Sequence, residues 1–256
     1  MELFTSDGIA FLLRWLHVLA GIAWIGLLYY FNVVQVPAFA AYGDEAKARN
    51  VSIDKLARRA LWWFRWAAVV TLVLGLLILS TQNSAGENYM KDFMSNVASN
   101  NLASDASIFV GMILGILMAA NVWMVIWKNQ KIVLANAANV LSGGEANPDA
   151  PAAGRRALLA SRQNMIFSVS MLFFMVGTSH FYALGDFAVN SDGAWTFVII
   201  AAVIIALLQL NALGKLGGTA ATNKLLWPYE THKNAIISAG VLFVVLYLLS
   251  EILLKG

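Results

Sequence analysis

Two histidines stand inside long apolar stretches of the sequence, where an ionisable side chain is costly. His17 lies in RWLHVLAGIAWIG, residues 14–26, and His180 lies in MVGTSHF, residues 175–181. Ionisable groups within membrane spans usually face the interior of a helix bundle and bind a partner or a ligand. Two neutral imidazoles at one depth on separate helices can hold a b-type haem, because its iron takes one nitrogen from each face of the ring. We therefore interpret His17 and His180 as candidate axial ligands of haem b.

An interpretation without a cofactor stays open, since two membrane histidines can also form hydrogen bonds across helices. The third histidine, His232, lies in WPYETHKN just before the last apolar stretch. The orientation derived below places it on the opposite side of the membrane from the other two. We interpret it as a loop or interfacial residue, with a second binding site as the alternative.

Arg14 lies three residues before His17 and so on the same face of a helix. A guanidinium there can pair with a haem propionate. Its alternative role is to reach the membrane surface with its long side chain. Gly21 and Gly26 follow on the same helix and would leave room for a flat ring.

A further set of polar side chains lies toward the other ends of the apolar stretches. Hydrogen bonding between helices is the default interpretation of this set. A polar, anionic heterocycle entering from the cytoplasm would need amide donors and an arginine, which makes Arg65 and Asn121 possible substrate contacts. The amide side chains of the set are those of Asn32, Gln35, Asn121, Asn129, Gln163 and Asn164.

Composition defines the elements that must position these residues. The 256 residues are 60% hydrophobic and 12% charged, whereas a soluble domain is about half apolar and about a quarter charged. The absence of cysteine excludes disulfides, iron–sulfur clusters and covalently attached haem. The basic residues are scattered over short connections, which argues against a nucleic-acid partner. The sequence predicts an integral membrane protein.

Six segments reach the roughly 20 apolar residues that a helix needs to cross a bilayer. We expect an all-α bundle of about six transmembrane helices in one domain, residues 1–256. Two stretches, 44–60 and 130–142, are predicted as short amphipathic helices on the cytoplasmic surface. The predicted spans are residues 8–35, 60–80, 107–127, 164–186, 194–213 and 234–254.

The orientation follows from the lysines and arginines, which gather in cytoplasmic connections. Thirteen of them lie in the connections after the first, third and fifth spans, whereas Lys91 and Lys255 are the basic residues of the other connections. Both termini are therefore predicted outside. At about 1.5 Å per residue, His17 then lies roughly 14 Å and His180 roughly 9 Å below the outer surface, so the two are at similar depth.

Four blocks of sequence resemble the membrane domain of the bacterial cytochrome-c-linked urate oxidase (urate hydroxylase) family. The resemblance is close over the first four spans and less distinct over the last two. The blocks are RWLHVLAGIAWIGLLYYFNVVQVP, ALWWFRWAAVVTLVLGLLIL, ANVWMVIWKNQK and PDAPAAGRRALLASRQNMIFSVSMLFFMVGTSHF.

The resemblance implies a multi-pass protein of the bacterial inner membrane that oxidises urate, a purine, to 5-hydroxyisourate. Many members carry a C-terminal c-type cytochrome domain that receives the electrons. Such a domain binds its haem through cysteines, and this sequence has none. We therefore expect the electrons to pass to a separate periplasmic c-type cytochrome or to other membrane subunits.

Two classes of function compete at this point. The first is a haem b oxidoreductase or electron-transfer subunit, with His17 and His180 as ligands. The second is a non-catalytic accessory subunit of a larger membrane electron-transfer complex. Transport is less favoured, because the sequence lacks the interrupted or mid-depth charged helices in corresponding halves that are typical of transporters.

Overall fold

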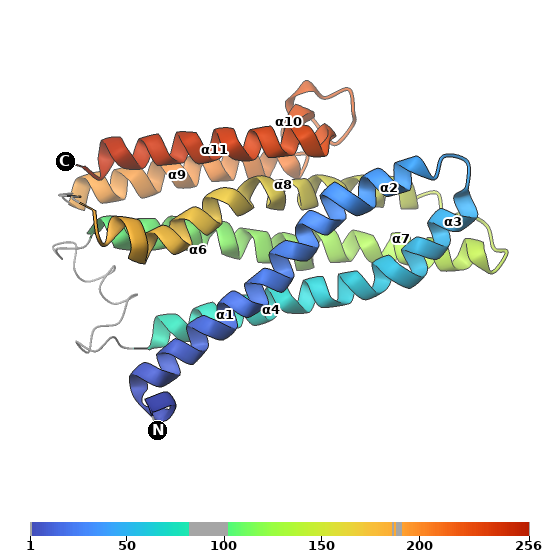
Figure 1. Ribbon diagram of the computed structural model, residues 1–256. Coiled ribbons are helices and arrows are strands. Elements are labelled where there is room, and N and C mark those ends of the chain that lie inside the picture. The colour runs from blue at the N-terminus through green and yellow to red at the C-terminus, as the bar shows by residue number, and fades with distance from the viewer. Residues whose placement is uncertain (1, 82–101, 186, 188–190, 256) are drawn as a thin grey trace.

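The computed structural model describes residues 2–81, 102–185, 187 and 191–255. This part of the chain is helical and contains no strand (Figure 1). Several helices follow one another without a break and form long rods. π-Helical turns link the successive helices within a rod (η2, η3 and η4) or end the rod (η5). The elements are α1 (Ser6–Tyr29), η2 (Tyr30–Gln35), α2 (Val36–Ala41), α3 (Ala46–Val51), η3 (Ser52–Ala57), α4 (Arg58–Ser80), α6 (Leu102–Ala120), η4 (Asn121–Trp127), α7 (Lys128–Leu141), α8 (Ala150–Gly177), η5 (Thr178–Tyr182), α9 (Ser191–Ala212), α10 (Trp227–Glu230) and α11 (His232–Leu253).

Six of the rods in the described chain are long and apolar enough to cross a membrane. Four of them are longer than a crossing needs. The rod Ser6–Ala41 has 36 residues and Ala103–Leu141 has 39, which correspond to about 54–58 Å against a hydrocarbon core of about 30 Å. By contrast, α9 and α11 have 22 residues each. The first four rods therefore extend past the other two at one end of the bundle, as Figure 1 shows.

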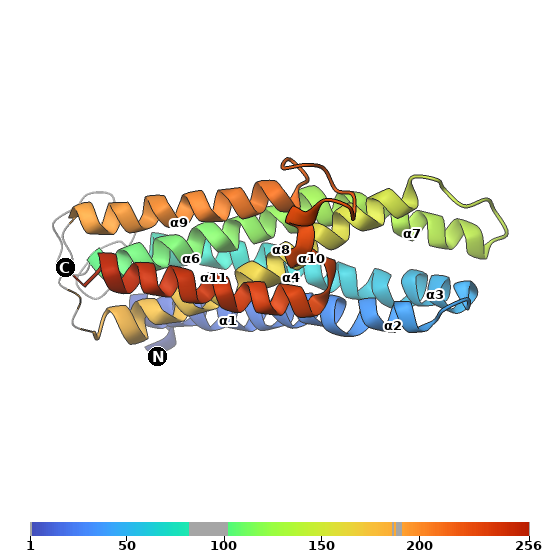
Figure 2. The same ribbon diagram turned by 90° about the horizontal axis from the view of Figure 1, so that it is seen from above.

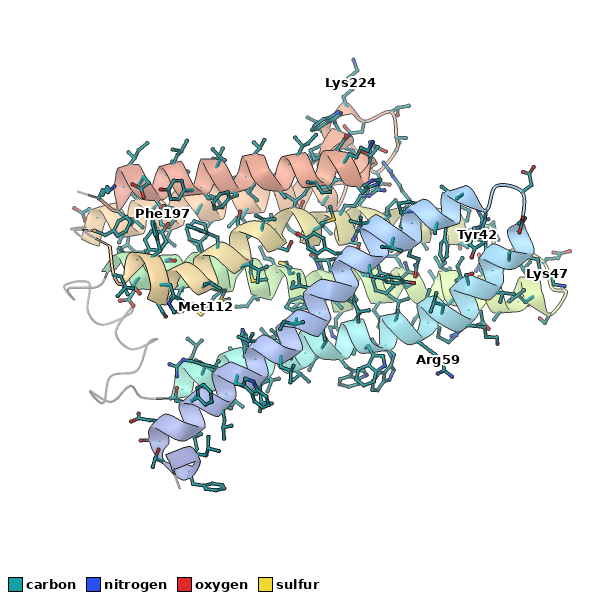
Figure 3. The ribbon with its side chains drawn as sticks, in the orientation of Figure 1. Tyr42, Lys47, Arg59, Met112, Phe197 and Lys224 are labelled. Carbon is teal, nitrogen blue, oxygen red and sulfur yellow. The ribbon has the colours of Figure 1, made fainter. Side chains whose placement is uncertain are left out.

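Both termini lie at the other end of the bundle, which agrees with six crossings (Figures 1 and 2). The basic residues of the first, third and fifth connections lie away from the termini. Lys47 lies in the first turn of α3, and Arg59 and Lys224 also lie away from the terminal end (Figure 3). The separation of charge predicted from the sequence is therefore a property of the folded chain.

The two stretches predicted as separate surface helices are helical, but they continue the membrane rods. Residues 44–60 fall largely within α3, η3 and the start of α4, and residues 130–142 lie almost entirely within α7. α3 and α7 contact each other, although no residue of α3 is buried. The two stretches are therefore continuations of long rods, a feature that the sequence pattern did not predict.

The fourth rod also begins earlier than predicted. It starts at Ala150 rather than at 164, with Pro151 in its first turn, where the missing N–H of proline has no intrahelical partner to lose. Arg155, Arg156 and Arg162, assigned to a connection from the sequence, are therefore helical. The predicted end of this span at residue 186, most of the polar connection around 82–101 and Lys91 lie outside the described residues.

Two of these arginines attach α10 to α8. Arg155 forms a two-pronged ion pair with Glu230, at 2.5 and 3.1 Å. Arg162 is almost fully buried and donates to the backbone carbonyls of Tyr229 and Glu230 at 2.5 and 2.6 Å. The connection between α9 and α11 is thus fixed against the central helix by charge-assisted hydrogen bonds.

A buried amide cluster joins three rods. Asn121 donates to Asn164 at 2.8 Å and to Gln209 at 3.0 Å, and Gln209 donates back to Asn121 at 2.6 Å. Asn164 donates in turn to the carbonyl of Met118 at 2.9 Å. Each amide of the cluster therefore has partners within it, which is the condition for burying polar groups at low cost.

The amide cluster makes Asn164 more important for stability than its neighbour Gln163. Asn164→Leu removes one acceptor of the Asn121 amide and the side-chain donor to the Met118 carbonyl, so we expect the free energy of unfolding to fall by about 1–3 kcal/mol. Unfolding followed by tryptophan fluorescence in detergent measures this change. Gln163→Leu is the matched control, because the buried Gln163 amide has no hydrogen-bond partner in the described structure. Equal losses in both variants would contradict the assigned role of the cluster.

Candidate functional site

His17 is held against α4 by a hydrogen bond that fixes its tautomer. Its Nδ1 lies 2.8 Å from the backbone carbonyl oxygen of Thr71. A carbonyl only accepts, so Nδ1 carries the proton and Nε2 of the neutral ring keeps its lone pair. Histidines that bind metals usually donate their other ring N–H to such a carbonyl, which orients the ring. The half-buried His17 therefore has the arrangement of a metal ligand.

Gly75 makes room for the His17 ring. A Cβ atom at this position would lie 3.1 Å from Cε1 and 3.4 Å from Nδ1 of His17. Both distances are shorter than an ordinary van der Waals contact, so a larger residue would push the imidazole away from Thr71. By contrast, a Cβ at Gly26 would meet nothing within 4 Å.

His180 and His17 are equally many residues from the contact between α1 and α8. Tyr29 Oη and Ser168 Oγ are 3.0 Å apart where α1 crosses α8. His17 is twelve residues before Tyr29, His180 is twelve residues after Ser168, and the two helices run in opposite directions. Both histidines are therefore about 18 Å from the crossing toward the terminal end, at about 1.5 Å per residue.

The two histidines are on rods that separate toward this end. Figure 1 shows α1 and α4 diverging as a pair from α6 and α8. Within the described chain no hydrogen bond joins the two imidazoles, and His180 is exposed. Two histidines that bind one haem iron do not touch each other, so the separation of the imidazoles is compatible with the group. The observation that fits haem is at His17, where the Nδ1 hydrogen bond leaves Nε2 as the nitrogen able to bind iron.

The other predicted residues of this site have mixed positions. Arg14 is exposed, one helical turn closer to the N-terminus than His17. His232 is the first residue of α11, at the end of that helix far from the termini (Figure 1). The bundle therefore separates His232 from His17 and His180. No group of three or more histidine, cysteine or acidic side chains suited to a metal ion occurs in the described residues.

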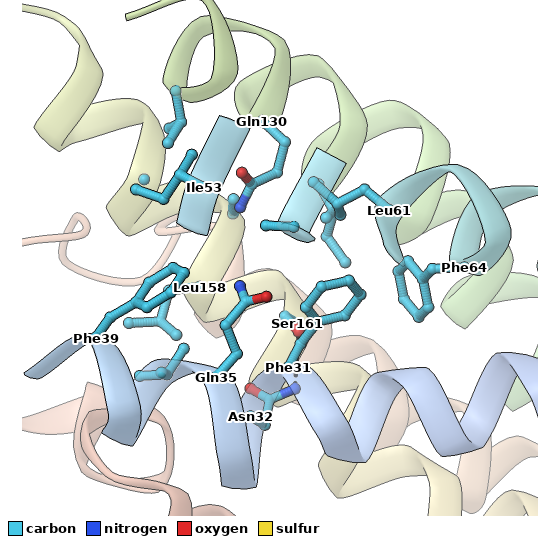
Figure 4. A pocket seen from close by; sticks show the side chains of 16 residues that line it. Phe31, Asn32, Gln35, Phe39, Ile53, Leu61, Phe64, Gln130, Leu158 and Ser161 are labelled. Atoms are coloured by element: carbon cyan, nitrogen blue, oxygen red, sulfur yellow. Dashed lines mark hydrogen bonds between the residues drawn. The ribbon is translucent and has the colours of Figure 1, made fainter. Parts of the chain in front are cut away.

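A second candidate site lies at the opposite end, where the first four rods extend past α9 and α11. It is a cavity of about 200 Å³ whose wall comes from η2 and α2, η3 and α4, η4 and α7, and α8 (Figure 4). Three of the four π-helical turns contribute to its lining. Such turns are rare and are frequent at functional sites, because the extra residue redirects the side chains that follow.

Amide groups and aromatic rings face this cavity. Asn32 is fully buried and donates from Nδ2 to the Leu28 carbonyl at 2.9 Å and to Ser161 Oγ at 2.8 Å. Its Oδ1 has no partner in the described structure, and the same is true of Gln35 Oε1. Figure 4 shows the amides of Gln35 and Gln130 pointing toward each other across the space.

The two residues predicted as substrate contacts do not line the cavity. The guanidinium of Arg65 lies 3.7 Å from the ring centroid of Trp127, stacked on the indole. Asn121 uses its amide in the buried cluster with Asn164 and Gln209. In the sequence, Asn32 and Gln35 are recognisable only as polar groups near helix ends, and no local pattern marks Gln130, Thr71 or Gly75.

Comparison with known families places the chain in one of them. Residues 89–237, more than half of the chain, match the family described as urate oxidase N-terminal. The chain belongs to this family. The match begins before the third rod and ends early in α11, so it includes His180 and Gln130 but not His17, Asn32 or Gln35. No curated protein and no solved structure matches the chain significantly.

The position of Gly75 in this urate oxidase-related chain gives a direct test of the His17 site. Gly75→Val is expected to lower the free energy of unfolding by about 1–3 kcal/mol, as overpacking typically does, because the imidazole must leave Thr71. Gly26→Val is the control and should change stability little, since the space there is open. Chemical denaturation in detergent measures both. A comparable loss of stability in both variants would mean that replacing any glycine of these helices destabilises the protein, whether or not the new side chain meets the His17 ring.

Proposed function

We propose that the chain is a haem b-binding oxidoreductase or electron-transfer protein of the bacterial inner membrane, acting on urate or a close relative. The match to the urate oxidase N-terminal family carries this proposal. In the corresponding half-reaction, urate and one water give 5-hydroxyisourate, two protons and two electrons. The chain therefore needs a place to bind the purine and a group that accepts electrons.

The residues of the His17 site support haem as that group. His17 would bind the iron through Nε2, Thr71 holds the ring by its Nδ1–H, and Gly75 gives it space. His180, at the same depth on the neighbouring rod, would be the second ligand, and Arg14 would pair with a propionate near the surface. When bound by two histidines, haem supplies one-electron transfer rather than oxygen binding.

The orientation of the bundle supports a periplasmic electron acceptor. Basic connections usually lie in the cytoplasm, which places the termini and the histidine pair toward the periplasm. A separate c-type cytochrome would meet the protein on this side. The cavity between the extended rods would then open on the cytoplasmic half, where a purine from metabolism is available.

The proposed orientation is testable with cysteine labelling, because the sequence has no cysteine of its own. Ser6→Cys and Ala146→Cys are both exposed positions at opposite ends of the bundle. In intact cells with a permeable outer membrane, a maleimide that cannot cross the inner membrane should label Ser6→Cys and not Ala146→Cys. Lysed cells, in which both must react, are the control. The reverse pattern would contradict the orientation.

Haem binding is tested by the reduced-minus-oxidised optical spectrum of the purified protein, with a pyridine haemochrome assay. A b-type α band is expected. His17→Ala, His180→Ala and Gly75→Val should each lose most of the haem, because each removes a ligand or displaces its ring. His232→Ala should retain it, since that residue lies at the other end of the bundle.

Urate added without another reductant should then reduce the wild-type haem. Loss of haem in all three histidine variants would contradict the ligand assignment. A well-folded wild-type protein without a haem band would contradict the cofactor and favour an accessory subunit of a larger complex.

A further inference from the structure

We propose that the cavity between η2, η3, η4 and α8 binds the purine substrate, as a flat lactam heterocycle whose ring N–H groups meet the amides of Asn32 and Gln35. This inference rests on the proposed function and gives it a substrate site. It is carried by two buried amide oxygens without a partner in the described structure, in a space lined partly by aromatic rings, and neither the family match nor the histidine pair assigns it.

The size of the cavity selects a small ligand. Its volume is about 200 Å³, below the ~300–1,000 Å³ of pockets for drug-sized ligands. A single fused bicyclic ring fits this range, whereas a nucleoside or nucleotide with its sugar and phosphates does not. A space of this size also holds several waters, so polar atoms in its wall can be satisfied before the ligand enters.

The orientation of the Asn32 amide is fixed by its neighbours. Its Nδ2 must be the atom facing the Leu28 carbonyl, because that oxygen cannot donate. Oδ1 is then the atom without a partner, fully buried. A buried acceptor of this kind destabilises the fold unless a donor forms a hydrogen bond with it. The matching donor on a ligand is an N–H or O–H group, and each lactam unit of an oxidised purine presents an N–H beside a C=O.

Two further amides extend the pattern across the cavity. Gln35 has a buried Oε1 without a partner, and the Gln130 amide faces it from α7 (Figure 4). An amide carries a donor and an acceptor side by side, as a lactam edge does, so the two can form paired hydrogen bonds. Amides on opposite walls could therefore hold two edges of one ring at the same time.

The remaining wall suits a flat ring. Phe31, Phe39 and Phe64 contribute aromatic side chains to the lining, and aromatic rings pack face-to-face with an offset or edge-to-face. The lining contains no charged side chain. Recognition would therefore depend on ring shape and on amide hydrogen bonds, which distinguishes this space from a phosphate or carboxylate site.

The cavity and the histidine pair are separate in space. Asn32 is fifteen residues from His17 on one continuous rod, a distance of about 22 Å along the axis at about 1.5 Å per residue. A ring bound in the cavity would not touch a group held by His17. Purine binding and haem retention should therefore respond to different substitutions.

Equilibrium dialysis of radiolabelled urate against the full chain in lipid nanodiscs tests the site. Gln35→Met and Asn32→Leu keep the approximate size of each side chain and remove its amide. Each should weaken urate binding about tenfold or more, because a ligand N–H loses its acceptor. Gln163→Met is the matched control, since its amide is buried and unpaired outside the cavity. It should bind urate as the wild type does.

The same samples separate the two proposals through their haem spectra. Weaker urate binding in the two cavity variants with an unchanged haem band supports the site. Normal urate binding and normal haem reduction by urate in both variants would overturn the site and leave the proposed function in place. A wild-type protein that neither binds urate nor is reduced by it would overturn both. Binding of a tailed quinol at this cavity, with urate unable to compete, would also overturn the site.

Discussion

Buried polar side chains of α8 hold the bundle together, because an apolar helix gains little specificity from packing against other apolar helices. Ser168 meets Tyr29 of α1, Ser161 meets Asn32 of η2, and Asn164 meets Asn121 of η4. Arg162 donates to the backbone of α10. Hydrogen bonds in such an interior select one neighbour and one register, since any other arrangement leaves a polar group without a partner. The central position of α8 follows from these four attachments.

α8 bonds to α1 where the two helices cross, at Tyr29 and Ser168, and to η2 on the side of this crossing that is far from the termini. This arrangement explains where the two candidate sites are. Toward the end far from the termini, η2 stays close to α8 and a cavity remains among the extended rods. Toward the terminal end, α1 pairs with α4 and leaves α8 (Figure 1). Asn32 Oδ1 is among the buried polar atoms of the described chain that no contact with α8 satisfies, and the His180 imidazole is exposed.

Several features of the fold followed from the sequence, and others did not. The number of spans and the separation of charge were predicted from apolar segments and from the positions of lysine and arginine, and the described residues agree with both. That residues 44–60 and 130–142 continue the long rods was not predicted, because the same amphipathic pattern suits a short surface helix and the extension of a span. The unbroken helices Ala46–Ser80 and Ala103–Leu141 decide between these two in the described chain. Haem, the acceptor cytochrome and the ligand roles of His17 and His180 stay predictions.

The sequence alone determined approximate positions along the helix axes, since an α-helix rises about 1.5 Å per residue. It could therefore predict similar depths for His17 and His180 before any contact was known. Only the tertiary structure decided which side chains meet around those axes. Tyr29 and Ser168 are 139 residues apart, and Asn121 and Gln209 are 88 residues apart, so no local pattern relates them. The packing of the helices gives the Asn121 amide partners on both its oxygen and its nitrogen, but leaves Asn32 Oδ1 without a partner in the described structure. Each hydrogen bond depends on the neighbour that the fold supplies.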